Sequence, residues 1–152
     1  MFVFIVLLFG AISGLIGAFA MTEFMLKVSS AYSKRVDMVR ALGSFFTRKP
    51  EGAQELGRKI HTLSGLFFGA LYFLTMYLIG GLNFPYAIFL GLGFGFFHGL
   101  TMSYILMFYA SAKHPIKKYR DATLEEGLLH LVGHIIFGII VGLMGALFSL
   151  SF

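Results

Sequence analysis

The sequence lacks cysteine altogether and contains few charged residues. The absence of cysteine from 152 residues excludes disulfides, iron–sulfur clusters and thiolate zinc sites, but leaves histidine-based metal or haem sites open. Only 12% of the residues are charged, against 58% hydrophobic, and the mean hydropathy is +0.85. A soluble domain of this length does not need so much apolar surface, so the composition predicts an integral membrane protein.

Catalytic and nucleic-acid motifs are missing as well. The sequence has no activated serine or cysteine nucleophile, no phosphate-binding loop, and neither a Cys-x-x-Cys-His nor a His-Glu-x-x-His motif. Its net charge of +5 accompanies no RNA- or DNA-binding motif, and we expect that charge to face a membrane surface. We therefore expect no enzyme, apart from a place as a subunit of an enzyme complex, and no nucleic-acid partner.

Four apolar stretches are long enough to cross a bilayer, which takes ~20 helical residues. They cover approximately residues 2–26, 61–82, 85–110 and 124–150. A backbone in lipid has to satisfy its own hydrogen bonds, so each stretch is expected to be a helix. The first resembles a signal peptide near Ala18-Phe19-Ala20, but no basic segment precedes it and its apolar run continues to Leu26. We predict an all-α fold in which residues 1–152 form one membrane domain, a four-transmembrane-helix bundle.

The basic residues indicate an orientation. Eight of the 12 Lys and Arg lie in loop 27–60 and four in loop 111–123, whereas the turn GGLNFP has none. The positive-inside rule then predicts a multi-pass protein of the plasma membrane with cytoplasmic basic loops and both termini outside. The first loop is expected either to form an amphipathic interfacial helix or to be an ordinary basic loop. The apolar side of such a helix would carry Val28, Tyr32, Val36, Val39, Leu42 and Phe46. In the second loop, Asp121 or Thr123 is expected to cap the fourth helix.

Two pairs of stretches are similar to each other. The second and fourth align at an offset of 69, which places His61 on His130 and Gly69 on Gly138. The first and third align at an offset of 85, which places Ser13 on His98. The alignment of the first and third stretches also places Gly10 on Gly95 and Gly14 on Gly99. This pattern favours two repeated helical hairpins related by an axis along the membrane normal.

Small residues recur at intervals of three and four along every stretch, and the same stripes carry all the membrane histidines. Because lipid supplies no hydrophobic drive between helices, close packing at small residues holds such bundles together. The stripes are therefore predicted to face the bundle interior. The packing residues are Gly10, Gly14, Gly65, Gly69, Gly95, Gly99, Gly138 and Gly142.

Histidines inside a membrane are costly and call for a functional hypothesis. Counted along the helices at 1.5 Å per residue, His98 lies roughly 21 Å from the basic end, His134 roughly 16 Å and His130 roughly 10 Å. We expect His98 to meet His134, and His61 to meet His130 with Glu23 and Glu126 close by.

Three interpretations of these residues stay open. The four histidines are candidate ligands of a haem or a transition metal, with Glu23 and Glu126 as further metal ligands. A chain of His98, His134, His130 and Glu23 could instead carry protons. The third interpretation is structural: the imidazoles hydrogen-bond across helices to hydroxyl side chains and hold the bundle in register. That interpretation names Ser13, Thr22, Ser64, Thr101 and Ser103 as partners. His114, in the second basic loop, is expected to be solvated.

The segments GHIIFGIIVGLMGAL (133–147) and GAISGLIGAFAMT (10–22) resemble the small uncharacterised four-helix membrane proteins of the YagU-like kind. His134, Phe137, Gly138 and Gly142 are the matching positions, and the long basic loop lies outside the likeness. The resemblance implies a polytopic membrane protein and no defined activity.

Four short spans with little mass outside the membrane favour a structural or accessory role. We expect the chain to be a subunit of a larger membrane complex of the respiratory or oxidase type, or a homo-oligomer. A His-ligated haem or metal protein is the alternative, and a small transporter or proton path is a further one. The partners are then the lipid bilayer and other integral subunits or copies of the chain.

Overall fold

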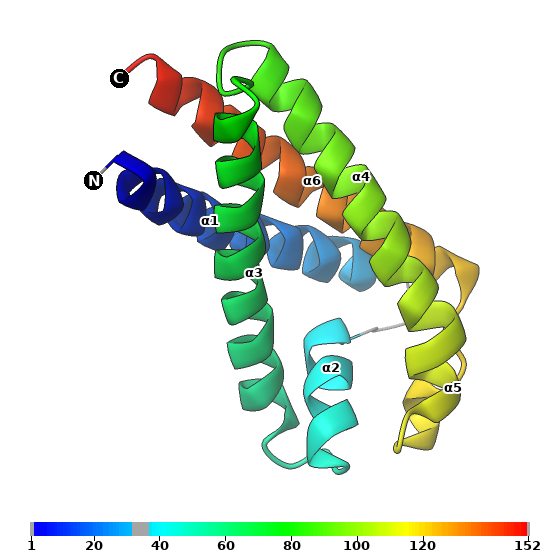
Figure 1. Cartoon of the computed structure of the whole chain (residues 1–152). Helices are drawn as coiled ribbons and strands as arrows, with labels where there is room; N and C mark the ends of the chain where they lie inside the picture. Colours follow the sequence, from blue (N-terminus) through cyan, green and yellow to red (C-terminus); the bar gives the residue numbers. More distant parts are fainter. Residues whose placement is uncertain (1, 32–36, 152) are drawn as a thin grey trace.

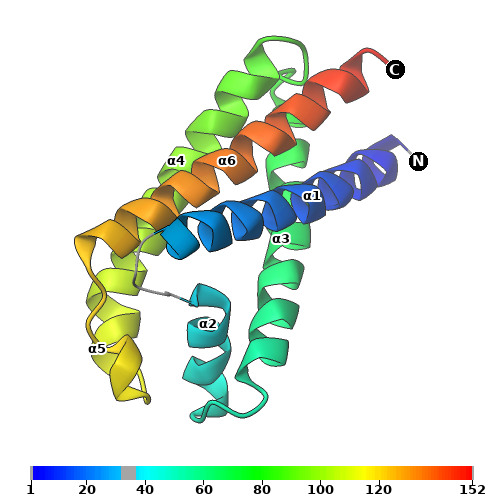
Figure 2. The ribbon, with the colours of Figure 1, turned by 180° about the vertical axis from the view of Figure 1, so that it is seen from behind.

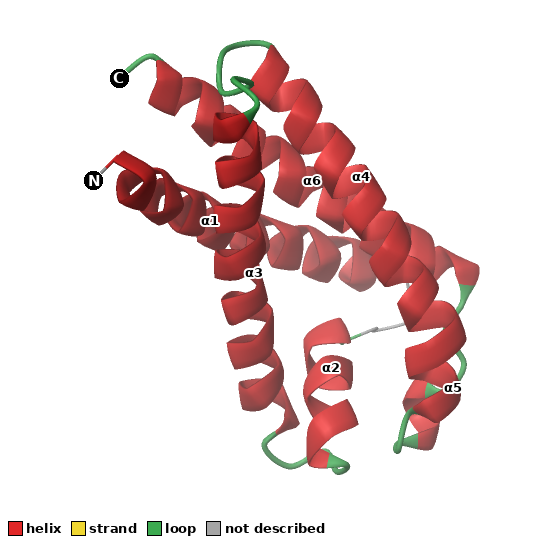
Figure 3. Cartoon of the chain, in the orientation of Figure 1, coloured by secondary structure: helices red, strands yellow, loops and turns green. Residues whose placement is uncertain are grey.

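The computed structural model describes residues 2–31 and 37–151, and within these ranges the chain is helical with no strand. The elements are α1 (Phe2–Ala31), α2 (Met38–Thr47), α3 (Ala53–Leu78), α4 (Tyr86–Ile105), the π-turn η1 (Leu106–Ala110), α5 (Ser111–Lys113), the 3₁₀ turn η2 (Lys117–Tyr119) and α6 (Leu124–Ser149) (Figure 3). The all-helical prediction is confirmed.

Four helical stretches are long and apolar enough to cross a membrane: Phe2–Val28, Ala53–Leu78, Tyr86–Lys113 and Leu124–Ser149. Both ends of the chain and the α3–α4 turn lie at one end of the bundle, and α2, α5 and η2 lie at the other (Figures 1 and 2). The four-helix membrane bundle expected from the sequence is therefore the observed architecture.

The second span differs from its predicted bounds. It begins at Ala53 rather than 61 because residues of the basic loop already form the first two turns of α3. It ends at Leu78 rather than 82, where Gly80, at φ 69°, turns the chain towards a cis Phe84–Pro85 bond. The third span begins one residue later than expected, and η1 widens it by one π-turn before α5. Asp121 and Thr123 were the two candidate caps of α6, and Thr123 is the residue that caps it, in a box with Glu126.

Glycines join the helices in two close pairs. A Cβ on Gly14 of α1 would lie 2.7 Å from the Cα of Gly69 of α3, far inside van der Waals contact. Similarly, a Cβ on Gly138 of α6 would lie 2.9 Å from the Cα of Gly95 of α4. The backbones of α1 and α3, and those of α4 and α6, therefore touch at these points, which only small residues allow. The predicted stripes do face the interior.

The two pairs use the same register. Gly10 meets Gly69 in the first pair as Gly95 meets Gly138 in the second. Gly14 meets Gly65 in the first pair, and Gly99 meets His134 in the second. His134 is the residue that aligns with Gly65. The predicted repeat thus corresponds to matching contacts in the two hairpins, with one change of chemistry. Where the first hairpin has Ser13 and Gly65, the second has His98 and His134.

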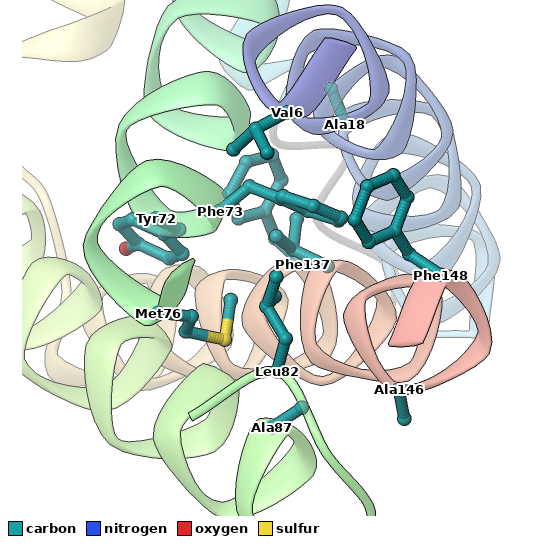
Figure 4. Packing of buried hydrophobic residues seen from close by; sticks show 11 residues of the cluster. Val6, Ala18, Tyr72, Phe73, Met76, Leu82, Ala87, Phe137, Ala146 and Phe148 are labelled. Atoms are coloured by element: carbon teal, nitrogen blue, oxygen red, sulfur yellow. The ribbon is translucent and has the colours of Figure 1, made fainter. Parts of the chain in front are cut away.

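The hydrophobic core lies near the end that holds the chain termini (Figure 4). Phe73 and Met76 of α3 and Val141 of α6 are fully buried there, and Phe73 meets Phe148 edge to face with ring centroids 5.3 Å apart. These large side chains fill the space between α1, α3, α4 and α6. Towards the other end the helices diverge, and the interior is no longer filled.

The first basic loop forms a helix that packs on the bundle. Of its two alternatives, an amphipathic helix and an ordinary basic loop, a helix is observed as α2, which carries Val39, Leu42 and Phe46. Val28 belongs to α1 instead, and Tyr32 and Val36 lie outside the described residues. Asp37 caps it by accepting a hydrogen bond from the backbone N–H of Arg40 (3.0 Å). A Cβ on Gly43 would overlap the carbonyl oxygen of Ala53, and one on Gly57 would overlap that of Val39. Therefore α2 is docked backbone to backbone against the first turns of α3.

Candidate functional site

The unfilled part of the interior is a cavity of about 420 Å³. It lies between α1, α3, α4 and α6, and α2, η1 and the second loop line its outer end. Most of the wall is apolar, with side chains such as Met21, Phe45, Phe68, Met102 and Phe137. Four membrane histidines also line it, and these are the candidate ligands His61, His98, His130 and His134. The sequence-predicted residues from three helices therefore meet in one space.

Three of the imidazoles form a continuous file. The ring centroids of His98 and His134 are 4.6 Å apart, and those of His134 and His130 are 4.7 Å apart. The predicted meeting of His98 and His134 across α4 and α6 is confirmed. Phe68 of α3 also contacts His98, with tilted rings whose centroids are 4.1 Å apart. His61 lines the same cavity as His130, from α3.

Hydrogen bonds fix how two of these rings present their nitrogen atoms. The Nδ1 of His134 lies 2.9 Å from the carbonyl oxygen of His130, which can only accept, so this Nδ1 donates and Nε2 keeps a lone pair. The Nδ1 of His98 lies 2.9 Å from the Tyr72 hydroxyl, which is also 3.0 Å from the carbonyl oxygen of Phe94. When Tyr72 donates to Phe94, His98 donates to Tyr72 and its Nε2 also becomes an acceptor.

His130 differs from its neighbours. Its Nδ1 is buried and has no hydrogen-bond partner anywhere in the described part of the chain. An unpaired buried polar atom costs ~1–3 kcal/mol, and native proteins rarely leave one without a reason. This orphaned nitrogen is therefore the most distinctive polar feature among the histidines that line the cavity.

The structural interpretation predicted partners that the histidines do not use. The hydroxyls of Ser13, Thr22 and Thr101 each donate to the carbonyl four residues earlier in their own helix, at 2.6, 2.9 and 2.9 Å. Ser103 donates instead to the carbonyl oxygen of Gly127 at 2.7 Å. Serine and threonine hydroxyls in helices reach the preceding turn easily, and this local bond competes with contacts across helices. The expectation of imidazole–hydroxyl bonds was wrong for these four residues.

The two acidic candidates do not belong to the cavity wall. The carboxylate of Glu126 accepts a hydrogen bond from the backbone N–H of Thr123 (2.7 Å) in the N-terminal cap of α6. Neither Glu126 nor Glu23 lines the cavity. Within residues 2–31 and 37–151, no three His, Asp or Glu side chains come close enough together to hold a metal ion. The expected cluster of His61, His130 and two carboxylates does not form.

The imidazole contacts also bear on haem binding. A bis-histidine haem needs one ring on each face of the porphyrin, with the iron between them. His98 and His134 touch each other, as do His134 and His130, so neither pair leaves room for a porphyrin between its rings.

His114 contacts α2, a role that the sequence pattern did not predict. It was expected to be solvated, but it is only 4% exposed. Its Nδ1 accepts from the backbone N–H of Ile116 (3.1 Å), so Nε2 carries the hydrogen and donates to the carbonyl oxygen of Ala41 in α2 (3.0 Å). Its ring also meets Phe45 edge to face. A lone histidine before Pro115 gives no pattern from which this role could be found.

Tyr119 strengthens the same contact between α2 and the second loop. Its ring centroid lies 5.0 Å from that of His114. Burial raises the pKa of the Tyr119 hydroxyl, the Asp37 carboxylate raises it further, and Arg40 opposes both. The second loop therefore contacts α2 through His114, and α2 lines the basic end of the cavity.

No family model, no curated protein and no solved structure matches the chain. The resemblance to YagU-like membrane proteins therefore stays a prediction, and the function has to be argued from the cavity itself.

Proposed function

We propose that the protein is a membrane-embedded binding protein, and that it holds a small, largely apolar molecule with a hydrogen-bonding group in the histidine-lined cavity. The observation that carries the proposal is the buried Nδ1 of His130, which lacks a partner within the described residues and belongs to a side chain that lines an unfilled space. A bound molecule would supply the missing bond. The cavity volume of about 420 Å³ also falls within the range of small-molecule sites, ~300–1,000 Å³.

The wall specifies the chemistry of the ligand. His134 presents an acceptor nitrogen because its Nδ1 hydrogen is bonded to a backbone carbonyl. A hydroxyl group, as in an alcohol or a phenol, would donate to that nitrogen and could accept from His130. The remaining wall is mostly apolar, with aliphatic, aromatic and methionine side chains, which suit an apolar body. We therefore assign the ligand to hydroxyl-bearing apolar molecules.

The experiment compares His130→Phe with Val132→Phe. Val132 lies on the same helix and is exposed, so the second variant introduces the same residue away from the cavity. Each protein is purified in mild detergent, and bound small molecules are measured by native mass spectrometry and solvent extraction. We expect wild type and Val132→Phe to carry a stoichiometric small molecule and His130→Phe to lose it.

The stability of the ligand-free proteins separates this proposal from a purely structural role. Because an unpaired nitrogen is unfavourable, His130→Phe should raise the melting temperature of ligand-free protein. Loss of stability in this variant, together with a wild type that carries no small molecule, would show that the imidazole only packs.

The orientation is part of the proposal. We place α2 and the second loop in the cytoplasm and both termini outside a plasma membrane. The reason is that all 12 Lys and Arg lie within loops 27–60 and 111–123. The chain has no cysteine, so a single Lys49→Cys thiol would be a unique reporter. It should react with an impermeant reagent only after intact cells are opened. Labelling of intact cells would reverse the assignment.

A histidine-bound metal is the second candidate, and one observation favours it. Metal-binding histidines commonly donate their second nitrogen to a carbonyl, as His134 does to His130. His98 could supply a second nitrogen, and the ligand or water would have to complete the coordination. Elemental analysis of protein purified without chelator tests this candidate, which requires one metal per chain that His134→Phe abolishes.

Two further expectations stay predictions. The file of His98, His134 and His130 rings also suits proton transfer, which requires proton flux in liposomes that depends on His134. A role as a subunit of a larger complex or a homo-oligomer requires co-purification with integral proteins or with a second copy. Each of these two roles is tested by an assay other than the one for ligand binding, so each can be decided separately.

A further inference from the structure

We infer that the ligand enters the cavity sideways from the bilayer, between α3 and α4, and is therefore a molecule dissolved in the lipid rather than in water. This inference rests on the proposed function and adds the route and the source of the ligand. The observation behind it is a second hollow on the outer surface, which shares three wall residues with the cavity: Phe68, His98 and Met102.

The hollow is a groove of about 500 Å³ between α3 and α4. The two helices diverge from their common turn, as both views of the ribbon show (Figures 1 and 2). The cause is the glycine pairing, because α3 packs its small residues on α1 while α4 packs its own on α6. The closely packed glycines of both helices are thus turned towards other partners. The groove is lined by Phe68, Leu71, Tyr72, Thr75, Phe94, Phe97, His98, Thr101 and Met102.

Only side chains separate the groove from the cavity. The Phe68 ring lies against the His98 ring, with centroids 4.1 Å apart, and Met102 lines both spaces beside them. Phe68 and Met102 are half-buried, and methionine is unbranched with three rotatable bonds. His98 is held more firmly, by its hydrogen bond to Tyr72. A change of rotamer at Phe68 and Met102 would therefore join the two spaces without moving a helix.

The chemistry of the groove suits a lipid-dissolved molecule. Phe97 and Leu71 form exposed apolar rims. The hydroxyls of Thr75 and Thr101 donate to their own helices, to Leu71 at 2.8 Å and to Phe97 at 2.9 Å. Their hydrogens are thus already bonded, and the groove presents an apolar surface to the acyl chains. His98 lies at its floor, roughly 21 Å from the basic end and so near the middle of the bilayer.

Entry from the aqueous end is more costly. There α2 lines the cavity, and it is fastened by backbone contact at Gly43 and Gly57 and by the hydrogen bond from His114 to Ala41. Widening the cavity at that end means undocking a helix, whereas joining the cavity to the groove means rotating two side chains. The geometry therefore favours the lateral route.

Thiol labelling tests the route without any knowledge of the ligand. The chain lacks cysteine, so Ser64→Cys places one thiol inside the cavity with little change in size. Its reaction with N-ethylmaleimide, which partitions into lipid, is compared with that of an anionic thiosulfonate in liposomes. Two variants serve as matched reference sites. Leu63→Cys is the neighbouring position, on the lipid-facing surface, and Lys49→Cys is exposed outside the spans.

We expect N-ethylmaleimide to modify Ser64→Cys. The anionic reagent should react with Ser64→Cys about 100-fold more slowly than with Lys49→Cys, or slower still, because a charge near the bilayer centre is disfavoured to that degree. Adding Phe68→Ala, or independently Met102→Ala, should speed the maleimide reaction several times while leaving Leu63→Cys unchanged. The independent second variant keeps the test valid where one substitution fails to fold.

Each contrary result has a different meaning. Rapid labelling of Ser64→Cys by the anionic reagent, with no effect of Phe68→Ala, shows an aqueous entrance and overturns the lateral route while the binding cavity stands. Failure of both reagents to modify Ser64→Cys shows that the cavity is closed to small molecules, and the proposed function falls with it.

Discussion

The contact between α4 and α6 allows a direct test of the glycine packing, by comparison of Gly95→Ala with Gly93→Ala. Both glycines lie in α4, two residues apart. A Cβ on Gly93 meets nothing within 4 Å. A Cβ on Gly95 would overlap the carbonyl oxygen of His134 and lie 3.0 Å from the Cα of Ile135 and 3.2 Å from that of Gly138. All three neighbours are backbone atoms of α6, which cannot rotate away as a side chain could.

The magnitude follows from what the two substitutions share. Each replaces glycine by alanine inside a helix and gains about 1 kcal/mol of helix propensity, so this gain cancels in the comparison. Only Gly95→Ala has to push α4 and α6 apart, and overpacking of this kind typically costs ~1–3 kcal/mol. We therefore expect Gly95→Ala to be less stable than Gly93→Ala by about 1–3 kcal/mol.

The assay is equilibrium unfolding in mixed micelles of rising dodecyl sulfate content, followed by far-ultraviolet circular dichroism. Wild type and both variants are measured under identical conditions. Equal free energies of unfolding for the two alanine variants would refute the packing argument, because the predicted contact would then be absent or freely relieved.

The remaining predictions concern the cap, the α2 contact and the polar file. Thr123→Ala should lower the free energy of unfolding by about 1 kcal/mol through loss of the helix cap, and Thr123→Ser should not; equal losses in the same micelle assay would contradict the capping box. His114→Ala should speed hydrogen exchange of the α2 amides by about tenfold, since a buried hydrogen bond contributes roughly 1 kcal/mol and its loss leaves a carbonyl unpaired; unchanged exchange would mean that His114 does not hold α2. Tyr72→Phe should shift the ¹⁵N resonance of His98 Nδ1 and cost about 1 kcal/mol, and an unaltered resonance would show that the two side chains do not meet.

The inward faces of the helices could be read from the sequence because two independent patterns coincide. Gly10, Ser13, Gly14 and Gly17 recur at helical spacing, and small residues in lipid have a single packing use. All four are buried in the structure. The same logic placed His134 in the interior and beside His98, because depth and face together leave few positions for a side chain.

The hydrogen bonds of the histidines could not be predicted in the same way. Periodicity gives the face of a helix, but not which of several polar groups on neighbouring faces will pair. Thr101 and Ser13 were plausible partners of His98 by depth, yet both hydroxyls are satisfied within their own helices. Tyr72 is the partner of His98 instead, because its longer side chain cannot reach its own backbone and spans the gap to α4.

The docking of α2 beside the cavity depends on contacts that only the folded chain reveals. Gly43 and Gly57 lie in the basic loop and at the start of α3, where glycine is ordinarily explained by turns. In the structure they are the points at which two backbones touch. The groove between α3 and α4 was equally hidden, because it results from where two other helix pairs have used their small residues.

The most direct measurement of the central claim is an experimental structure of the protein taken from native membranes without delipidation, at a resolution that shows the imidazole rings. We expect density for a small molecule in the cavity, with a polar atom within hydrogen-bond distance of His130 Nδ1 and an apolar body against Phe68 and Phe137. A cavity closed by rearranged side chains, with His130 Nδ1 bonded to another residue of the chain, would contradict the account.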